Sequence, residues 1–279
     1  MSAPNLDVLI RLLDDETPEV RRSVVEALRS YRGDVSERMG EIGRDLSRNE
    51  RALLSELLGA GRRDRLRAEW AVPSGGWKAL GNDWDRAEAL LSLISDFLHD
   101  GVTLRLPMSD GLDLLAEEYE IAGGVECPAA LGRWLFADGR FSGNEEHFHA
   151  PENSDLAWVL ATGLSNPLGL ALVYILVGRR LGIEVQGCAF PSRFLCRIEI
   201  DGRVRILDCY DEARSYDLEG LLARGNIRGQ ARRALTIPAP PGAILVRLVR
   251  NLHHALVMSA RDEDAELTAE LLASLNADP

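Results

Sequence analysis

The spacing of apolar residues predicts a helical N-terminal segment. Aliphatic residues recur every three or four positions over 6–13 and again over 20–28, which is the period of one helix face. Pro18 lies between the two stripes, where the first turn of a helix tolerates its missing amide donor. Thr17 precedes it at an N-cap position, and Glu19 falls in the first turn. The pattern therefore predicts two helices joined by a turn.

This first helix pair also carries a repeat pattern. Its Leu-Leu-x-Asp, followed by Pro-x-Val-Arg-x-x-Val-x-x-Ala-Leu, resembles a HEAT repeat, and a more divergent pair is expected from about Ser36 to Trp70 on a leucine stripe that includes Leu53. Two such pairs bury little surface alone, so the resemblance implies a short array that leans on a following domain. Small, permissive residues then interrupt the helical period. We expect a HEAT-like segment over residues 1–72 and a linker over 73–83.

Beyond the linker, the pattern predicts helices followed by strands. Pro167 opens a long apolar helix that ends near Gly182, a residue suited to a left-handed cap. After Gly182 the period changes from helical to alternating. The predicted elements are helices at 84–98, 108–121, 129–136, 155–161 and 168–181, one or two helices within 243–275, strands at 185–190, 193–200 and 203–210, a loop at 141–154, and a short helix with a loop at 213–235.

A two-residue turn sets the register of the predicted hairpin. Asp201-Gly202 lies between two alternating strands, and Asp-Gly is among the strongest hairpin signals in a single sequence. The resulting register places Arg193 opposite Tyr210. Asp208 then lies diagonally across, on the same face and within reach of the arginine side chain.

Several short motifs follow one another in a specific order, although each alone is weak. They are Phe141-x-Gly143-Asn144, Asn153-Ser154-x-Leu156-x-x-Val159-Leu160, Gly178-Arg179-Arg180-Leu181-Gly182-Ile183, Pro191-x-x-Phe194-Leu195, Asp208 and Arg247-Leu248-Val249-Arg250-Asn251-Leu252. Together they resemble the SirB-type branch of the transglutaminase-like superfamily. The resemblance implies an α+β fold with a papain/transglutaminase-like core, in which a helix packs on a small antiparallel sheet, and with C-terminal helices. We therefore expect residues 84–279 to form a transglutaminase-like domain.

The resemblance places a catalytic triad at positions that carry other residues here. In active members a nucleophilic cysteine begins the core helix, which corresponds to Pro167, and a histidine lies on the first hairpin strand, which corresponds to Arg193. Only the acid, Asp208, is retained. Thiol catalysis needs a thiolate, a base that exchanges a proton near neutral pH, and a group that orients the base. Arginine keeps its proton in proteins, so Arg193 cannot be that base.

The retained acid and the arginine support two interpretations. Arg193 and Asp208 can form an ion pair that braces the hairpin against the core helix. Alternatively, Arg193 can receive a carboxylate or phosphate of a small ligand. Tyr210 would line such a pocket or simply pack, and the other candidate binding residues are Asn153 and Asn166.

Cysteines and histidines at other positions could form a catalytic site with a different arrangement. His147-Phe148-His149 has a spacing that can supply two metal ligands, but a metal site needs three or four converging donors, so no metal is expected. A cysteine-dependent acyl-transfer or peptidase-type enzyme would need His147 or His149 to meet a thiol near Asp208. Cys127 is expected to be the most exposed thiol. Cys188, Cys196 and Cys209 are expected to be buried, the last two on the face opposite Asp208.

Composition narrows the classes of partner. A net charge of -12 argues against nucleic acid and anionic membranes, since both require a concentrated basic surface. The sequence shows no phosphate-binding glycine loop, so no cofactor is expected. It shows no secretory signal and no long apolar stretch, which predicts a cytoplasmic protein. We expect a noncatalytic transglutaminase-like protein that acts as a protein-interaction or scaffolding module; the alternatives are a rearranged cysteine enzyme and a binder of small anions at Arg193.

Overall fold

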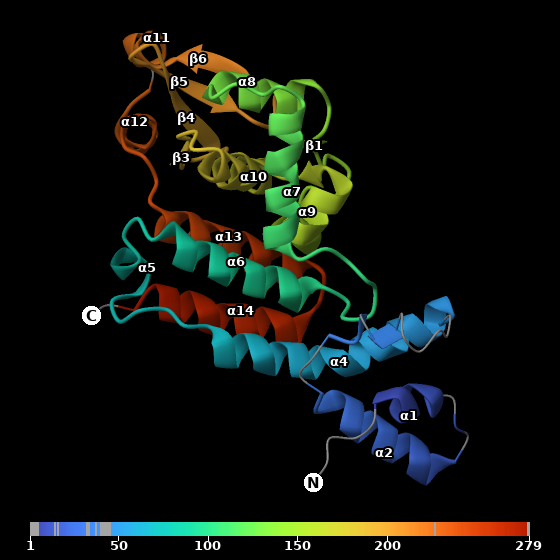
Figure 1. The fold of residues 1–279 in the computed structure, drawn as a ribbon. Coiled ribbons are helices and arrows are strands. Elements are labelled where there is room, and N and C mark those ends of the chain that lie inside the picture. The colour runs from blue at the N-terminus through green and yellow to red at the C-terminus, as the bar shows by residue number, and fades with distance from the viewer. Residues whose placement is uncertain are drawn as a thin grey trace. The chain divides into compact units, whose positions relative to one another are not determined.

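The chain separates into two compact units in the computed structural model (Figure 1). Residues 6–13, 15, 17–31, 34–36, 38–39, 46–225 and 227–277 are described. Unit 1 comprises Met1–Ala71 and Asp96–Arg105, and unit 2 comprises Val72–Ser95 and Leu106–Pro279. Residues 96–105 thus pack with the N-terminal part of the chain, which the sequence pattern does not predict.

The described part of unit 1 contains α1 (Leu6–Arg11), α2 (Pro18–Arg29) and α4 (Arg48–Glu69). The first two confirm the predicted helix pair, with Pro18 at the start of α2. Thr17 occupies the N-cap position, but its side chain makes no capping hydrogen bond. Leu53 is 42% exposed, so its predicted place in the apolar stripe was wrong. The first helix of the predicted second pair falls largely outside the described residues.

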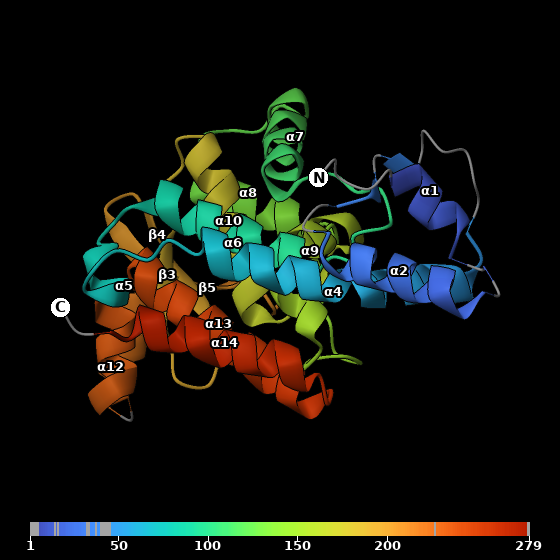
Figure 2. The same cartoon turned by 90° about the horizontal axis from the view of Figure 1, so that it is seen from below.

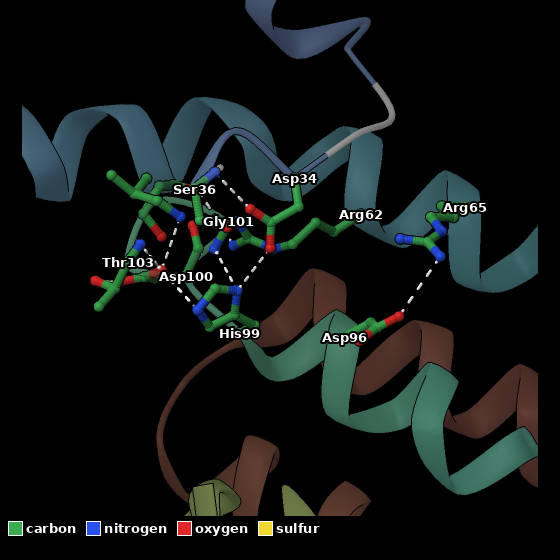
Figure 3. Close-up of polar contacts among 11 residues, drawn as sticks. Asp34, Ser36, Arg62, Arg65, Asp96, His99, Asp100, Gly101 and Thr103 are labelled. Atoms are coloured by element: carbon green, nitrogen blue, oxygen red, sulfur yellow. Dashed lines mark hydrogen bonds and ion pairs between the residues drawn. The ribbon is translucent and has the colours of Figure 1, made fainter. Parts of the chain in front are cut away.

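A polar clasp joins two segments of unit 1 (Figure 3). The Val35 amide donates to the Gly101 carbonyl at 2.9 Å, and Asp34 Oδ2 lies 2.9 Å from Nδ1 of the buried His99. Burial would raise the pKa of Asp34, but hydrogen bonds from His99 and Ser36 outweigh it and lower the pKa to about 2. The clasp therefore depends on an ionised Asp34.

Unit 2 contains most of the helices and both sheets. Helix α10 packs against strands β3 and β4, and α13 and α14 lie side by side (Figure 2). The helices are α5 (Gly76–Ala79), α6 (Trp84–Leu98, whose last three residues count in unit 1), α7 (Met108–Ile121), α8 (Pro128–Gly132), the π-helix η1 (Arg133–Ala137), the 3-10 helix η2 (Pro151–Ser154), α9 (Leu156–Thr162), α10 (Pro167–Arg180), α11 (Leu218–Ala223), α12 (Gly229–Thr236), α13 (Pro241–Met258) and α14 (Asp262–Leu275).

The larger sheet is antiparallel with strand order β3-β4-β5-β6. Its central hairpin has the predicted register, with Ile200 opposite Arg203, and Asp201 and Gly202 both take the positive φ that a tight primed turn requires (51° and 72°). This turn fixes which residues of the two strands meet. The strands are β3 (Gln186–Cys188), β4 (Leu195–Ile200), β5 (Arg203–Asp208) and β6 (Arg214–Asp217).

Two predictions for the loops of unit 2 were incomplete. The segment 213–235 contains a fourth strand, β6, as well as two short helices. The expected loop 141–154 contains β1 (Ser142–Gly143), which pairs in parallel with β2 (Leu164–Ser165), and the helix η2. None of these short strands has an alternating apolar pattern long enough to be recognised.

Ionic contacts link the end of α10 to two neighbouring helices. Arg180, near the end of α10, donates to Glu88 of α6 (Nη2 to Oε1, 2.6 Å) and to Asp113 of α7 (Nε to Oδ1, 2.5 Å). The Arg180 side chain is 18% exposed, so these bonds are partly shielded from water. They hold the core helix in place beside the sheet.

The clasp in unit 1 yields a pH-dependent prediction. Because folding depresses the pKa of Asp34 from 3.8 to about 2, its stabilising contribution is present above about pH 4 and is lost as the pH falls toward 2. At neutral pH, Asp34→Asn should lower the hydrogen-exchange protection of the Val35 amide about fivefold, since about 1 kcal/mol remains after solvent screening. Asp64→Asn, on the exposed surface of the same unit, is the control. Unchanged protection in Asp34→Asn would contradict the prediction.

Candidate functional site

The start of α10 shows why the expected nucleophile position cannot act as one. Asn166 caps the helix, and its Oδ1 accepts hydrogen bonds from the amides of Leu168 (3.0 Å) and Gly169 (3.1 Å). Pro167 follows as the first helical residue and is buried. Asparagine at the cap and proline at the next position form a strong helix start. The side chain of Asn166 is thus committed to the helix, and Pro167 has no thiol.

The retained acid is engaged on both oxygens. Asp208 Oδ2 accepts a hydrogen bond from Arg193 Nη1 at 2.6 Å, and Oδ1 accepts one from the Tyr210 amide at 3.1 Å. The Asp208 side chain is only 6% exposed, whereas that of Arg193 is 44% exposed. The hydrogen bond to Asp208 raises the pKa of Arg193. The structure therefore forms the ion pair that the hairpin register predicts, with the carboxylate inside and the guanidinium at the surface.

Tyr210 links the ion pair to the smaller sheet. Its ring lies against Gly143, where an added Cβ would come within 2.4 Å of the ring. The Arg193 guanidinium lies 5.5 Å from the ring centre, and the Phe148 ring lies 6.1 Å away at a steep angle. Burial raises the pKa of Tyr210. Tyr210 thus packs between Arg193 and β1, and only glycine at position 143 leaves room for it.

Asn153 organises the loop before α10 through its hydrogen bonds. Its Nδ2 donates to the carbonyls of His147 (2.8 Å) and Phe148 (3.0 Å), and its Oδ1 accepts from Asn144 (3.1 Å). Its own carbonyl accepts from the Ser165 hydroxyl at 3.0 Å. Because Asn153 is 1% exposed, its amide is fully used inside the protein. The sequence analysis missed this network, and the paired motifs Gly143-Asn144 and Asn153-Ser154 are the signal that could have indicated it.

The structure brings together only part of the predicted site. Arg193, Asp208 and Tyr210 touch one another. Asn153 reaches them through Phe148, which contacts Tyr210. In the part of the chain that the structure describes, no hydrogen bond or ion pair joins Asn166 to Arg193 or Asp208.

The hydrogen-bond partners of the buried thiols are a backbone carbonyl and a second thiol. Cys188 donates to the Ala234 carbonyl at 3.2 Å, and burial raises its pKa to about 12. The sulfur atoms of Cys196 and Cys209 lie 3.7 Å apart, and burial holds the pKa of Cys209 well above its usual value. Cys127 is half-buried. Among the described residues no thiol is hydrogen-bonded to an imidazole, the contact by which a neighbouring base would activate it.

The histidine loop lies at the surface. His147 and His149 are exposed, and the His149 ring lies 5.9 Å from that of His254 on α13. Within the described ranges, no three His, Cys, Asp or Glu residues converge as a metal site would require. Of the helices in the described ranges, none combines the length and the apolar character needed to span a bilayer.

Comparison with known proteins places these features in a family. The chain is 38% identical over 154 residues to a UPF0162 protein of Xylella fastidiosa strain Temecula1, covering 53% of this chain and 55% of that protein. It is 39% identical over 106 residues to a UPF0162 protein of Pseudomonas aeruginosa, covering 37% and 38% of the two chains. The chain thus spans about half the length of the curated relatives it matches. No solved structure matches it.

The family match covers the elements that build the site. A family described as "Transglutaminase-like superfamily" matches residues 108–250, about half of the chain. This range includes α10, the four-stranded sheet, and the positions of Pro167, Arg193 and Asp208. The chain belongs to the transglutaminase-like superfamily.

Proposed function

We propose that this protein is a noncatalytic member of the superfamily that acts as a protein-interaction module. The observation that carries the proposal is the bond between Arg193 and the buried Asp208. By the resemblance, these two positions correspond to the histidine and the acid of the catalytic triad. Asp208 is paired with Arg193, which keeps its proton, and so the carboxylate orients a group that cannot act as a base.

The missing chemistry supports the same proposal. A transglutaminase-like reaction needs a thiolate at the start of the core helix, and Pro167 supplies none. Arg193 cannot take a proton from a thiol at neutral pH. The rearranged-enzyme alternative needs a cysteine next to a histidine near Asp208, and the hydrogen bonds of the thiols do not support it.

The interaction half of the proposal rests on architecture. We include in this proposal that the chain belongs to the SirB-type branch and that unit 1 is HEAT-like. A HEAT-like unit 1 supports an interaction role because stacked helix pairs expose surfaces that bind other proteins. The net charge of -12 favours a protein partner over nucleic acid or an anionic membrane. A cytoplasmic location is a separate part of the same proposal. The exposed guanidinium of Arg193 keeps a small anionic ligand as the second candidate.

The brace formed by the ion pair can be tested by its effect on stability. Arg193→Leu leaves the Asp208 carboxylate buried without its counter-charge, so it should lower the free energy of unfolding by about 2 kcal/mol. Adding Asp208→Asn should restore more than half of that loss, measured by chemical denaturation of the full chain. Arg214→Leu, in an exposed ion pair with Asp211, is the matched control and should have little effect. The pair would not stabilise the fold if Arg193→Leu were as stable as the native protein. The same conclusion would hold if the losses of Arg193→Leu and Asp208→Asn simply added in the double variant.

The absence of turnover is tested with the full chain in acyl-transfer and peptidase assays. We expect no incorporation of a fluorescent amine into a glutamine peptide and no cleavage of unfolded casein. A variant with all four cysteines replaced by serine is the control and should give the same result as the native protein in these assays. Turnover by the native chain that disappears in the cysteine-free variant would overturn the proposal. Stabilisation by phosphate or acetate that is lost in Arg193→Leu would favour the second candidate.

A further inference from the structure

A hollow in unit 2 has a buried arginine in its wall. Its volume is about 530 Å³, and it lies beside the turn of the β4–β5 hairpin. The residues that matter in its wall are Glu184, Gln186, Arg197, Glu199 and Asp201. None of the positions inherited from the catalytic triad lines it. Its chemistry is therefore separate from that of Arg193 and Asp208.

Arg197 is the unusual feature of this cavity. It is 9% exposed and lies on β4 opposite Gln186 of β3. Its Nη1 donates to the Leu235 carbonyl near the end of α12, and its Nε lies 3.4 Å from Gln186 Oε1. Among the described residues no carboxylate forms an ion pair with Arg197, and its Nη2 has no hydrogen-bond partner. A helix terminus supplies only a partial negative charge, so this buried guanidinium lacks a full counter-charge.

The remaining charges of the cavity are negative. Gln186 Nε2 donates to Glu184 Oε1 at 2.7 Å, which directs the Gln186 oxygen toward Arg197. Glu199 and Asp201 are exposed, and in the described part of the chain their carboxylates have no partner. Glu199 is two residues beyond Arg197 on β4, so both project from one face of the strand about 7 Å apart. The cavity thus presents a cation at depth and carboxylates at the rim.

We propose that this cavity binds a basic amino-acid unit, lysine or arginine, through its α-carboxylate and its side-chain cation. The carboxylate pairs with Arg197, and the side-chain cation lies between Glu199 and Asp201. A simple anion would meet the acidic rim, and a polyamine would have no group for Arg197, so a ligand with both charges fits best. Such a unit can be a free amino acid or the C-terminal residue of a peptide. The inference stands whether or not the remnant triad is inert.

Calorimetric titration of the full chain tests this site. We expect arginine to bind at least tenfold more tightly than agmatine, which lacks the carboxylate, and than inorganic phosphate, which lacks the cation. Glu199→Gln should weaken arginine binding at least tenfold without affecting folding, because the side chain is exposed. Glu219→Gln, an exposed carboxylate outside the cavity, should leave binding unchanged. Arg197→Gln should abolish binding, with thermal unfolding as the check that it is folded.

Further titrations distinguish the two possible sources of the ligand, a free amino acid and the C-terminal residue of a peptide. Tighter binding of a tetrapeptide ending in arginine than of free arginine assigns the site to a partner's C-terminus, and the reverse assigns it to the free amino acid. Equal binding of arginine and agmatine, full affinity in Glu199→Gln, or no heat with any of these probes would overturn the proposal. None of these results depends on turnover or on the stability of the Arg193–Asp208 pair.

Discussion

A buried carboxylate in the hairpin must be neutralised, and the way it is neutralised governs this fold and its chemistry. Asp208 is almost fully enclosed, and a buried charge is tolerated only when it is paired and hydrogen-bonded. Histidine could meet that need while exchanging a proton. Arginine meets it permanently, because its proton does not leave in a protein. Arg193 therefore ties the segment before β4 to the end of β5 through a partner that does not exchange its proton.

The surroundings of this pair are consistent with a structural role. Tyr210 packs between Arg193 and Gly143, so the ion pair also holds the smaller sheet against the larger one. The loop before α10 is held by the amide of Asn153 and ends at the cap formed by Asn166. These polar side chains are used for internal hydrogen bonds.

Strongly periodic and locally encoded features could be predicted from the sequence. The Asp201-Gly202 turn fixes the hairpin register by backbone geometry alone, and this register predicted that Asp208 would be within reach of Arg193. The strands are shorter than predicted, so Arg193 lies before β4 and Tyr210 lies after β5. The core helix was equally accessible, because proline and glycine mark its two ends. Features that depend on distant partners were not accessible. Strand β6, the hydrogen bonds of Asn153 and the packing of residues 96–105 with unit 1 arise from contacts that leave no periodic signal.

The central claim is that no thiol of this protein is activated, and thiol reactivity measures it most directly. Native full-length protein can be treated with iodoacetamide across pH 6 to 9, with each cysteine followed by mass spectrometry. We expect that no cysteine reacts faster at pH 6 than a free cysteine thiol, and that the buried thiols Cys188, Cys196 and Cys209 react only after unfolding. Rapid alkylation of any one cysteine at pH 6 in the folded protein would contradict it.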